Sequence, residues 1–359
     1  MDIQETISLT FGDCGENHVG MDKLGNIVNK GEGFNLDDLN NYKEIFEKYG
    51  NKCFIYNLKD QLINSIDSNI LDTIDDSFIL VVKNGLNTLL TKNNYKTIDL
   101  YNQLNSFEWD RKYFDTRRNK VLNKNARANV CFNNYNLEPD YENKQGRVVS
   151  YDNIPLLKCI KDELANIDEK MNNLICEGNR YFNLKQCGIG YHGDAERRKV
   201  IAFRIGHSMD LHFSWFYKNN HIGETLKLTL QNNDMYIMSE KALGNDDDEI
   251  QQRNFLIKLH VPCIHMMNVG KGECHDPRHC RDCFVNFHAK GFWHRDGCDR
   301  HPGNTNVPTL LEMTQLKKLM ENFDKNPPAK KPEIPLMEYK VTKSSPTTAK
   351  KTTTKPGVS

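Results

Sequence analysis

A series of short strand-like segments, separated by polar turns, constrains the fold of this chain most. The segments span residues 199–206, 211–217, 225–230 and 235–238, and the turns between them are rich in Asn and Asp. Short strands that recur at regular spacing with such turns are typical of β sandwiches and jelly rolls. The pattern therefore predicts a jelly-roll-like β core over this part of the chain.

A His-x-Asp pair, His192 and Asp194, lies just before these strands at the end of an aromatic, strand-like run. Residues two apart on an extended chain face the same way, so the two side chains can share one metal ion. Two His and one carboxylate on one face of an octahedron form the Fe(II) site of non-haem oxygenases, which keeps positions open for co-substrate and dioxygen. The alternative interpretation is a surface turn with a solvated aspartate.

The residues around this pair resemble the AlkB-like 2-oxoglutarate/Fe(II)-dependent dioxygenases, whose pattern is Asn-x-Tyr, a short turn, and then Ile-Gly-x-His-x-Asp. The matching positions here are Asn179, Tyr181, Ile189, Gly190, His192 and Asp194. By this resemblance, Asn179 and Tyr181 would bind 2-oxoglutarate, while His192 and Asp194 would hold Fe(II). The implied fold class is α+β, with a double-stranded β-helix (jelly-roll) core, an N-terminal α/β extension and a C-terminal Cys/His-rich segment.

A second resemblance covers most of residues 1–262. Over this range the chain is similar to uncharacterised proteins of large DNA viruses that carry a His-Gly-Asp-x-Glu-Arg-Arg block, here residues 192–198. Within the block, Glu196, Arg197 and Arg198 could grip a substrate or support the metal ligands, or they could be solvated charges at the end of a strand.

The third iron ligand is expected at His260, in the strand-like segment 255–262. The resembling family also has histidine at this position, and His265 is a competing candidate. The earlier histidines come too soon along the chain and are expected in turns or at the surface: His207, His212 and His221.

The cation that would pair with the distal carboxylate of 2-oxoglutarate is less clearly marked. The family usually has arginine just before the last histidine, but here that residue is Leu259, with Lys258 one position earlier. Lys258 is a candidate, although a shift of one residue reverses the face of a strand. The alternatives are Arg204, Lys241 and Arg278.

A Cys/His-rich segment follows the predicted core. Cys280 and Cys283 have the Cys-x-x-Cys spacing that binds one Zn(II), and Cys274 with Cys298 or His301 could supply a second pair of ligands. A closed site of four ligands would be structural. The alternative is a loop of reduced thiols and exposed histidines without metal.

These features predict five regions. The regions are an N-terminal α/β domain (1–115), an AlkB-like domain (116–262), a zinc segment (263–305), a short helix (306–325) and a disordered Pro, Lys and Thr tail (326–359). Within them, periodicity predicts a helix over 36–49, a buried strand over 78–82 and a helix over 155–174.

Composition narrows the class of protein. Lys plus Arg (48) equals Asp plus Glu (48), so no global positive field indicates a protein that coats nucleic acid. No run of apolar residues is long enough to cross a membrane, and no signal segment opens the sequence. Eleven cysteines without such a signal are read as thiols or metal ligands. We expect a soluble intracellular protein, in the host cytoplasm or virion if the chain is viral, and composition leaves the oligomeric state open.

The leading functional hypothesis is an Fe(II)- and 2-oxoglutarate-dependent dioxygenase that hydroxylates or demethylates a macromolecular substrate, either nucleic acid or protein. A nucleic-acid substrate would predict a basic groove beside the iron. The alternative is a catalytically degenerate AlkB-like fold that acts as a zinc-containing binding protein.

Overall fold

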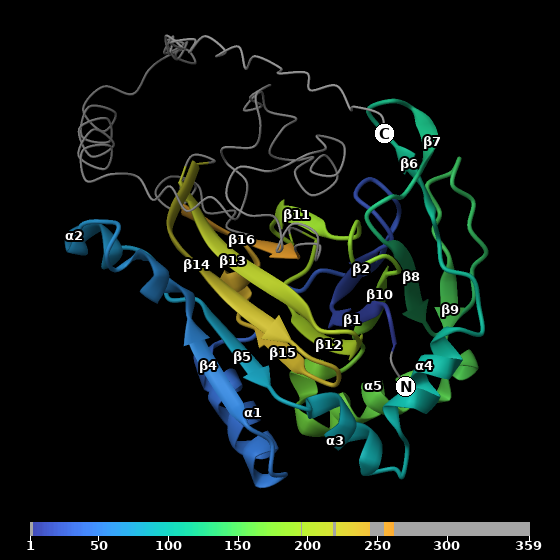
Figure 1. The fold of residues 1–359 in the computed structure, drawn as a ribbon, viewed down its shortest axis with the longest axis horizontal. Helices are drawn as coiled ribbons and strands as arrows, with labels where there is room; N and C mark the ends of the chain where they lie inside the picture. Colours follow the sequence, from blue (N-terminus) through green and yellow to red (C-terminus); the bar gives the residue numbers. More distant parts are fainter. Residues whose placement is uncertain (1–2, 195, 218–219, 245–254, 262–359) are drawn as a thin grey trace, which may run out of the picture. The chain divides into compact units, whose positions relative to one another are not determined.

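Antiparallel strands dominate the computed structural model, which describes residues 3–194, 196–217, 220–244 and, for the backbone alone, 255–261. The larger sheet has eight strands in the order β4-β5-β15-β12-β1-β10-β8-β9 (Figure 1). Its members are β1 (Thr6–Gly12), β4 (Cys53–Asn57), β5 (Phe78–Val82), β8 (Ala128–Asn133), β9 (Val148–Ser150), β10 (Ile175–Tyr181), β12 (Val200–Gly206) and β15 (Met235–Met238). All neighbours are antiparallel except β8 and β9, which are parallel.

The smaller sheet has four antiparallel strands in the order β11-β16-β13-β14. These strands are β11 (Ile189–His192), β13 (Met209–Tyr217), β14 (Asn220–Leu230) and β16 (Phe255–Val261). Two hairpins complete the described strands, namely β2 (Cys14–Glu16) with β3 (Lys23–Gly25) and β6 (Lys112–Asp115) with β7 (Lys120–Asn123). From β10 to β16 the chain crosses between the two larger sheets at every step except from β13 to β14, which form a hairpin in the smaller sheet.

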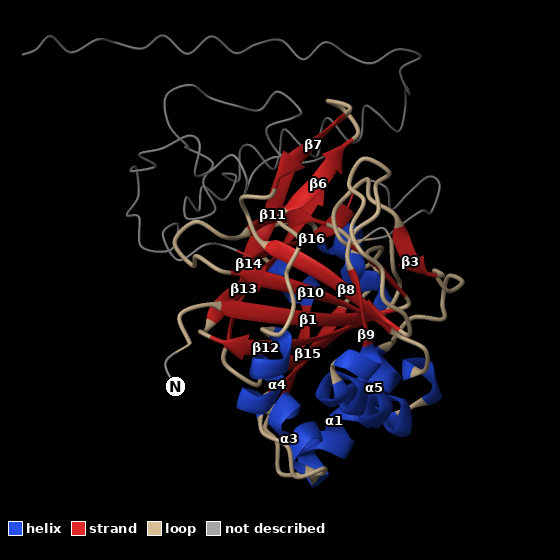
Figure 2. Cartoon of the chain, turned by 90° about the vertical axis from the view of Figure 1, so that its right-hand side faces the viewer, coloured by secondary structure: helices blue, strands red, loops and turns tan. Residues whose placement is uncertain are grey.

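Helices α1, α3, α4 and α5 lie on one side of the eight-stranded sheet, and the four-stranded sheet lies on the other (Figure 2). The α-helices are α1 (Leu36–Lys48), α2 (Ser68–Leu71), α3 (Gly85–Thr91), α4 (Thr97–Leu104) and α5 (Pro155–Ile167). Short 3-10 helices are η1 (Leu58–Leu62), η2 (Tyr151–Asn153), η3 (Glu169–Met171) and η4 (Glu240–Leu243). Across the described ranges, every helix is too short or too polar to span a membrane.

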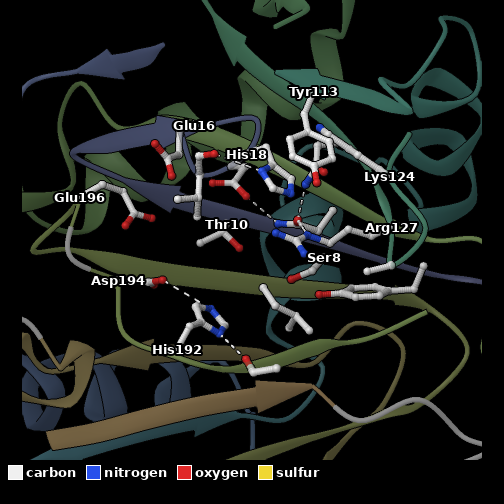
Figure 3. Close-up of a pocket in the computed structure, with 18 of the residues that line it drawn as sticks. Ser8, Thr10, Glu16, His18, Tyr113, Lys124, Arg127, His192, Asp194 and Glu196 are labelled. Atoms are coloured by element: carbon white, nitrogen blue, oxygen red, sulfur yellow. Dashed lines mark hydrogen bonds and ion pairs between the residues drawn. The ribbon is translucent and has the colours of Figure 1, made fainter. Parts of the chain in front are cut away.

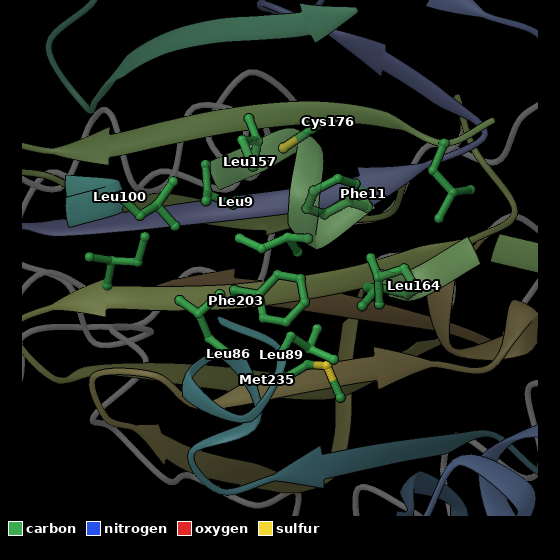
Figure 4. Close-up of a cluster of buried hydrophobic side chains, with 14 of the residues drawn as sticks. Leu9, Phe11, Leu86, Leu89, Leu100, Leu157, Leu164, Cys176, Phe203 and Met235 are labelled. Carbon is green, nitrogen blue, oxygen red and sulfur yellow. The ribbon is translucent and has the colours of Figure 1, made fainter. Parts of the chain in front are cut away.

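The two faces of the eight-stranded sheet differ in chemistry because residues alternate along each strand. On β1, Leu9 and Phe11 are fully buried against the helices, and Phe203 of β12 packs beside them (Figure 4). Leu86 and Leu89 of α3 and Leu157 of α5 cover this apolar face. The opposite face carries polar side chains and forms the floor of a cavity.

Strand β1 lies in the centre of the sheet. It pairs with β10 on one side, where Ser8 is opposite Asn179, and with β12 on the other, where Ser8 is opposite Arg204. Strands β4 and β5 extend the same sheet beyond β15. Strands from residues 1–115 therefore share one sheet with strands from residues 116–262, because backbone pairing ignores distance along the sequence.

Most predicted elements of the core occur close to their expected places. The helix predicted over 36–49 is α1, which begins with a capping box between Asn35 and Asp38. The helix predicted over 155–174 ends earlier, at Ile167, because Asp168 is extended and its side chain caps η3 instead. The predictions beyond residue 261 lie outside the described residues: the zinc segment (263–305), the helix (306–325) and the tail (326–359).

Candidate functional site

A cavity of about 1060 Å³ opens over the polar face of the eight-stranded sheet (Figure 3). Residues that alternate along four neighbouring strands form its floor. These residues are Ser8 and Thr10 of β1, Glu177, Asn179 and Tyr181 of β10, Arg204 of β12 and Tyr236 of β15. His192, Asp194 and Glu196 line the same cavity, so the structure brings the predicted iron pair and the predicted co-substrate residues to one site.

His192 and Asp194 face each other at the end of β11. Nδ1 of His192 lies 2.8 Å from the carbonyl oxygen of Gly190, and its Nε2 lies 3.6 Å from Oδ1 of Asp194. A carbonyl only accepts hydrogen bonds, so Nδ1 donates to it, and Nε2 is the ring nitrogen turned toward Asp194. Such a bond from the outer nitrogen is how proteins orient a metal-binding histidine. The pair therefore presents two donor groups with chemistry that suits a divalent metal.

Tight backbone contacts set the position of Asp194. A Cβ on Gly193 would lie 3.0 Å from the carbonyl oxygens of Leu243 and Gly244, so the chain passes close to η4 at this point. The amide of Asp194 donates to the carbonyl of Leu243 at 2.9 Å. Burial raises the pKa of the Asp194 carboxyl, while the nearby Arg197 acts in the opposite direction.

Arg197 is buried and joins three carboxylates. Its Nη2 lies 2.6 Å from Glu177 and 2.7 Å from Glu196, and its Nε lies 4.0 Å from Asp194. Of the three interpretations considered for this charged block, support of His192 and Asp194 fits Arg197, and a solvated charge at a strand end does not. Glu177 was not singled out in the sequence, although it precedes Asn179 by two residues on the same strand face.

Asn179 is held by hydrogen bonds within the cavity wall. Its Oδ1 accepts from Arg127 Nε at 2.6 Å and from Asn129, and its Nδ2 donates to Glu177 at 2.9 Å. An amide nitrogen carries two hydrogens, so one N–H of Asn179 remains for a ligand. Tyr181 is 3% exposed, and the guanidinium carbon of Arg204 lies 5.9 Å from its ring centre.

The backbone of β16 lies beside the metal pair. His192 is opposite Leu259, the residue before His260, on the neighbouring antiparallel strand. The side chains of His260 and Lys258 are outside the described residues, as are His265 and the four cysteines predicted to bind zinc, Cys274, Cys280, Cys283 and Cys298. In the part of the chain that the structure describes, no group of three His, Cys, Asp or Glu side chains is arranged to hold a metal.

Of the histidines set aside as too early, His212 was placed wrongly. It is only 5% exposed and lies within β13, where its backbone is opposite that of His260. The strand pairs with β14 and β16, and the burial of this polar ring within it is not revealed by the alternation of the sequence.

The candidate cations for the distal carboxylate of 2-oxoglutarate differ in their ion pairs and in their position relative to the cavity. Lys241 is committed to an ion pair with Asp75 at 2.8 Å, and Arg278 lies outside the described residues. Arg204 is 1% exposed and lines the cavity.

Cationic residues form another wall of the cavity. Lys124 and Arg127 line it beside His18, whose ring stacks on Tyr113 with centroids 3.7 Å apart. Burial lowers the pKa of Lys124 to about 7 and that of His18 to about 3. These residues were not identified from sequence, although residues 111–127 contain seven Lys or Arg and only one acid, Asp115.

Comparison with known proteins finds one clear similarity. An uncharacterized protein of Acanthamoeba polyphaga mimivirus, R156, is 42% identical over 245 residues, which cover 68% of this chain and 91% of the relative. No protein-family model matches the chain.

Proposed function

The chain belongs to the same family as this mimivirus protein, and we propose that it is an Fe(II)- and 2-oxoglutarate-dependent dioxygenase. One observation carries the proposal: His192 and Asp194 converge on a large polar cavity, with Nδ1 of His192 bonded to the Gly190 carbonyl and Nε2 turned toward Asp194. Asn179 and Tyr181 line the same cavity, as the resemblance to AlkB-like enzymes requires.

The proposed core is a double-stranded β-helix. Its support is the path of the chain from β10 to β16, which crosses between the two larger sheets at every step except from β13 to β14. A jelly roll winds in this way. The cavity lies on the face of the larger sheet that is turned away from the helices.

Each residue of the site has a defined part in the proposal. His192 and Asp194 would bind the metal, and His260 would be its third protein ligand. Bound Fe(II) and 2-oxoglutarate would supply the oxidising chemistry, with dioxygen as oxidant and succinate and carbon dioxide as products. The free N–H of Asn179 and the hydroxyl of Tyr181 orient the co-substrate. Arg197 would fix the carboxylates around the metal through its ion pairs with Glu177 and Glu196.

The cationic wall favours a polyanionic substrate, of which nucleic acid is the first to test. Arg117 and Arg118 are exposed in the β6–β7 turn and line the cavity together with Arg127. A single strand bound there should lose affinity with salt, with a slope of about −0.7 per neutralised phosphate. Replacing both exposed arginines with Ala should flatten the slope by about one unit or more, measured by fluorescence anisotropy. An unchanged slope would exclude this wall as the binding surface.

The enzyme hypothesis is tested by anaerobic titration of the purified full chain with Fe(II) and 2-oxoglutarate. We expect a visible metal-to-ligand absorption band, and succinate release once oxygen is admitted. His192→Ala should lose both signals. His207→Ala, whose ring bonds a backbone carbonyl outside the cavity, serves as the matched control and should retain them. Absence of both signals from the unaltered protein would overturn the assignment.

A binding protein on the same fold is the second candidate. It is favoured by Asn179, whose carbonyl oxygen is already occupied by Arg127 and Asn129. Metal analysis separates the two candidates. Bound zinc without the Fe(II)/2-oxoglutarate band would favour the binder.

A further inference from the structure

Arg204 differs from half-buried Arg180 of β10 and from buried Arg197 before β12, because it has no acidic partner among the described residues. Its side chain is 1% exposed, and neither Nε nor Nη1 donates a hydrogen bond there. Its one recorded side-chain contact is the ring of Tyr181 at 5.9 Å. By contrast, Arg180 makes two bonds to Glu5 at 2.7 and 2.8 Å, and Arg197 binds Glu177 and Glu196.

An unpaired buried guanidinium is energetically costly. Arginine stays charged at any ordinary pH, so it cannot escape the cost of burial by losing a proton. Proteins retain such charges where a ligand completes the pairing, and a planar guanidinium matches the geometry of a carboxylate. The position of Arg204 in the cavity floor therefore indicates an anion that binds from the cavity side.

Neighbouring hydroxyl groups complete the surroundings of the guanidinium. Ser8 is opposite Arg204 on β1, and Tyr236 lies on the next strand, β15, opposite Ala202. Both side chains are at most 4% exposed and line the cavity. Burial raises the pKa of Tyr236 to about 12, so this phenol keeps its proton and can donate a hydrogen bond to an anion.

The location of Arg204 relative to Asn179 suits a short ligand with two charged ends. Both residues are opposite Ser8, one on each side of β1, so their backbones are two strand spacings or about 10 Å apart. Asn179 lies at the end of the cavity proposed to bind the metal, because it donates a hydrogen bond to Glu177, which pairs with Arg197. A ligand held at the metal by one end could thus reach Arg204 with the other.

We propose that Arg204 of β12 binds the distal carboxylate of 2-oxoglutarate, with Tyr236 and Ser8 as additional donors. The inference rests on the proposed function. The resembling enzymes bind the distal carboxylate with an arginine on the strand that here carries Leu259. In this chain the proposal assigns that role to Arg204, in the centre of the larger sheet. Lys258 is then not needed for this role.

A double comparison of protein and ligand tests the proposal. The ligands are 2-oxoglutarate and 2-oxopentanoate, which has the same chain length and keto acid but ends in a methyl group. Calorimetric titration of the anaerobic Fe(II) protein should show about 100-fold weaker binding of 2-oxopentanoate, the loss typical of a broken buried charge pair. In Arg204→Met the preference should disappear, because 2-oxoglutarate alone loses affinity. Arg204→Lys should keep part of it, since lysine retains the charge without the fork.

Arg180→Met is the matched control and should keep the full preference for 2-oxoglutarate. Near-ultraviolet circular dichroism verifies the fold of each variant. An Arg204→Met protein with undiminished preference would overturn the role of Arg204 and leave the enzyme hypothesis standing. Failure of the unaltered protein to bind either keto acid would refute both the role of Arg204 and the enzyme hypothesis.

Discussion

Replacing Arg204 with methionine should stabilise the ligand-free protein. The side chain is 1% exposed and its Nε and Nη1 lack partners among the described residues, so folding removes the charge from water with little return. Apolar replacement of buried ionic groups commonly gains 1–4 kcal/mol, and methionine retains the apolar stem that packs near Tyr181. We expect about 2 kcal/mol in the free energy of unfolding. For a domain of this size the melting temperature should rise by about 6 °C.

Saturating 2-oxoglutarate should make the unaltered protein more stable than Arg204→Met. At a 2-oxoglutarate concentration of about 100 times Kd, the unaltered protein gains about 2.7 kcal/mol, while Arg204→Met gains far less. Urea denaturation of the anaerobic Fe(II) protein, with and without 2-oxoglutarate, measures both effects. Arg180→Met provides the contrast: it strands Glu5, which is 12% exposed, and should destabilise by about 2 kcal/mol with or without ligand. A ligand-free Arg204→Met protein that is less stable than the unaltered chain would refute the reasoning, since the charge would then be compensated inside the protein.

Two further predictions concern the walls of the cavity and the core. Because burial lowers the folded pKa of Lys124 to about 7, the unfolded chain holds more protons above that pH, and stability rises with pH. The unfolding free energy of the unaltered protein, minus that of Lys124→Met, should therefore rise by about 1.4 kcal/mol per pH unit from pH 7 toward pH 10 in urea titrations. Replacing the exposed Lys48 with Met should leave the pH dependence unchanged. If the unfolding free energies of Lys124→Met and of the unaltered protein changed in parallel with pH, the burial of Lys124 would be contradicted. Gly178→Ala should destabilise by about 2 kcal/mol in the same assay, since its Cβ would lie 2.8 Å from the ring of Trp109. That ring is anchored by its bond to Leu104, and a change below about 0.5 kcal/mol would show that it can move.

The local elements of this protein are readable from its sequence. Strand alternation and turn residues predict β12, β13 and β15, and helical periodicity with an N-terminal cap predicts α1. The His-x-Asp spacing also predicts a shared face for His192 and Asp194, and the structure places them 3.6 Å apart. These features depend on residues a few positions from one another.

The cavity floor could not be predicted in the same way, because it depends on pairing between distant strands. Arg197 looks like a solvated charge until Glu177, from another strand, is placed 2.6 Å away. Arg204 was one of several candidate cations, and only its burial on the polar face separates it from Lys241, which pairs with Asp75. Sequence alternation gives the face of a strand but not what covers that face.

The central place of β1 has a consequence for how the protein is made. Thr6 pairs with Tyr181 and with Gly206, so β1 has no neighbour in the sheet until β10 has left the ribosome, and it gains its second neighbour only with β12. Sheets closed by such distant contacts form slowly, and an unpaired apolar strand is prone to aggregate in the interval. Ser8 and Thr10 reach the cavity only when β1 inserts. The binding pocket is thus a late product of folding, and chaperone demand during synthesis should fall mainly on this first strand.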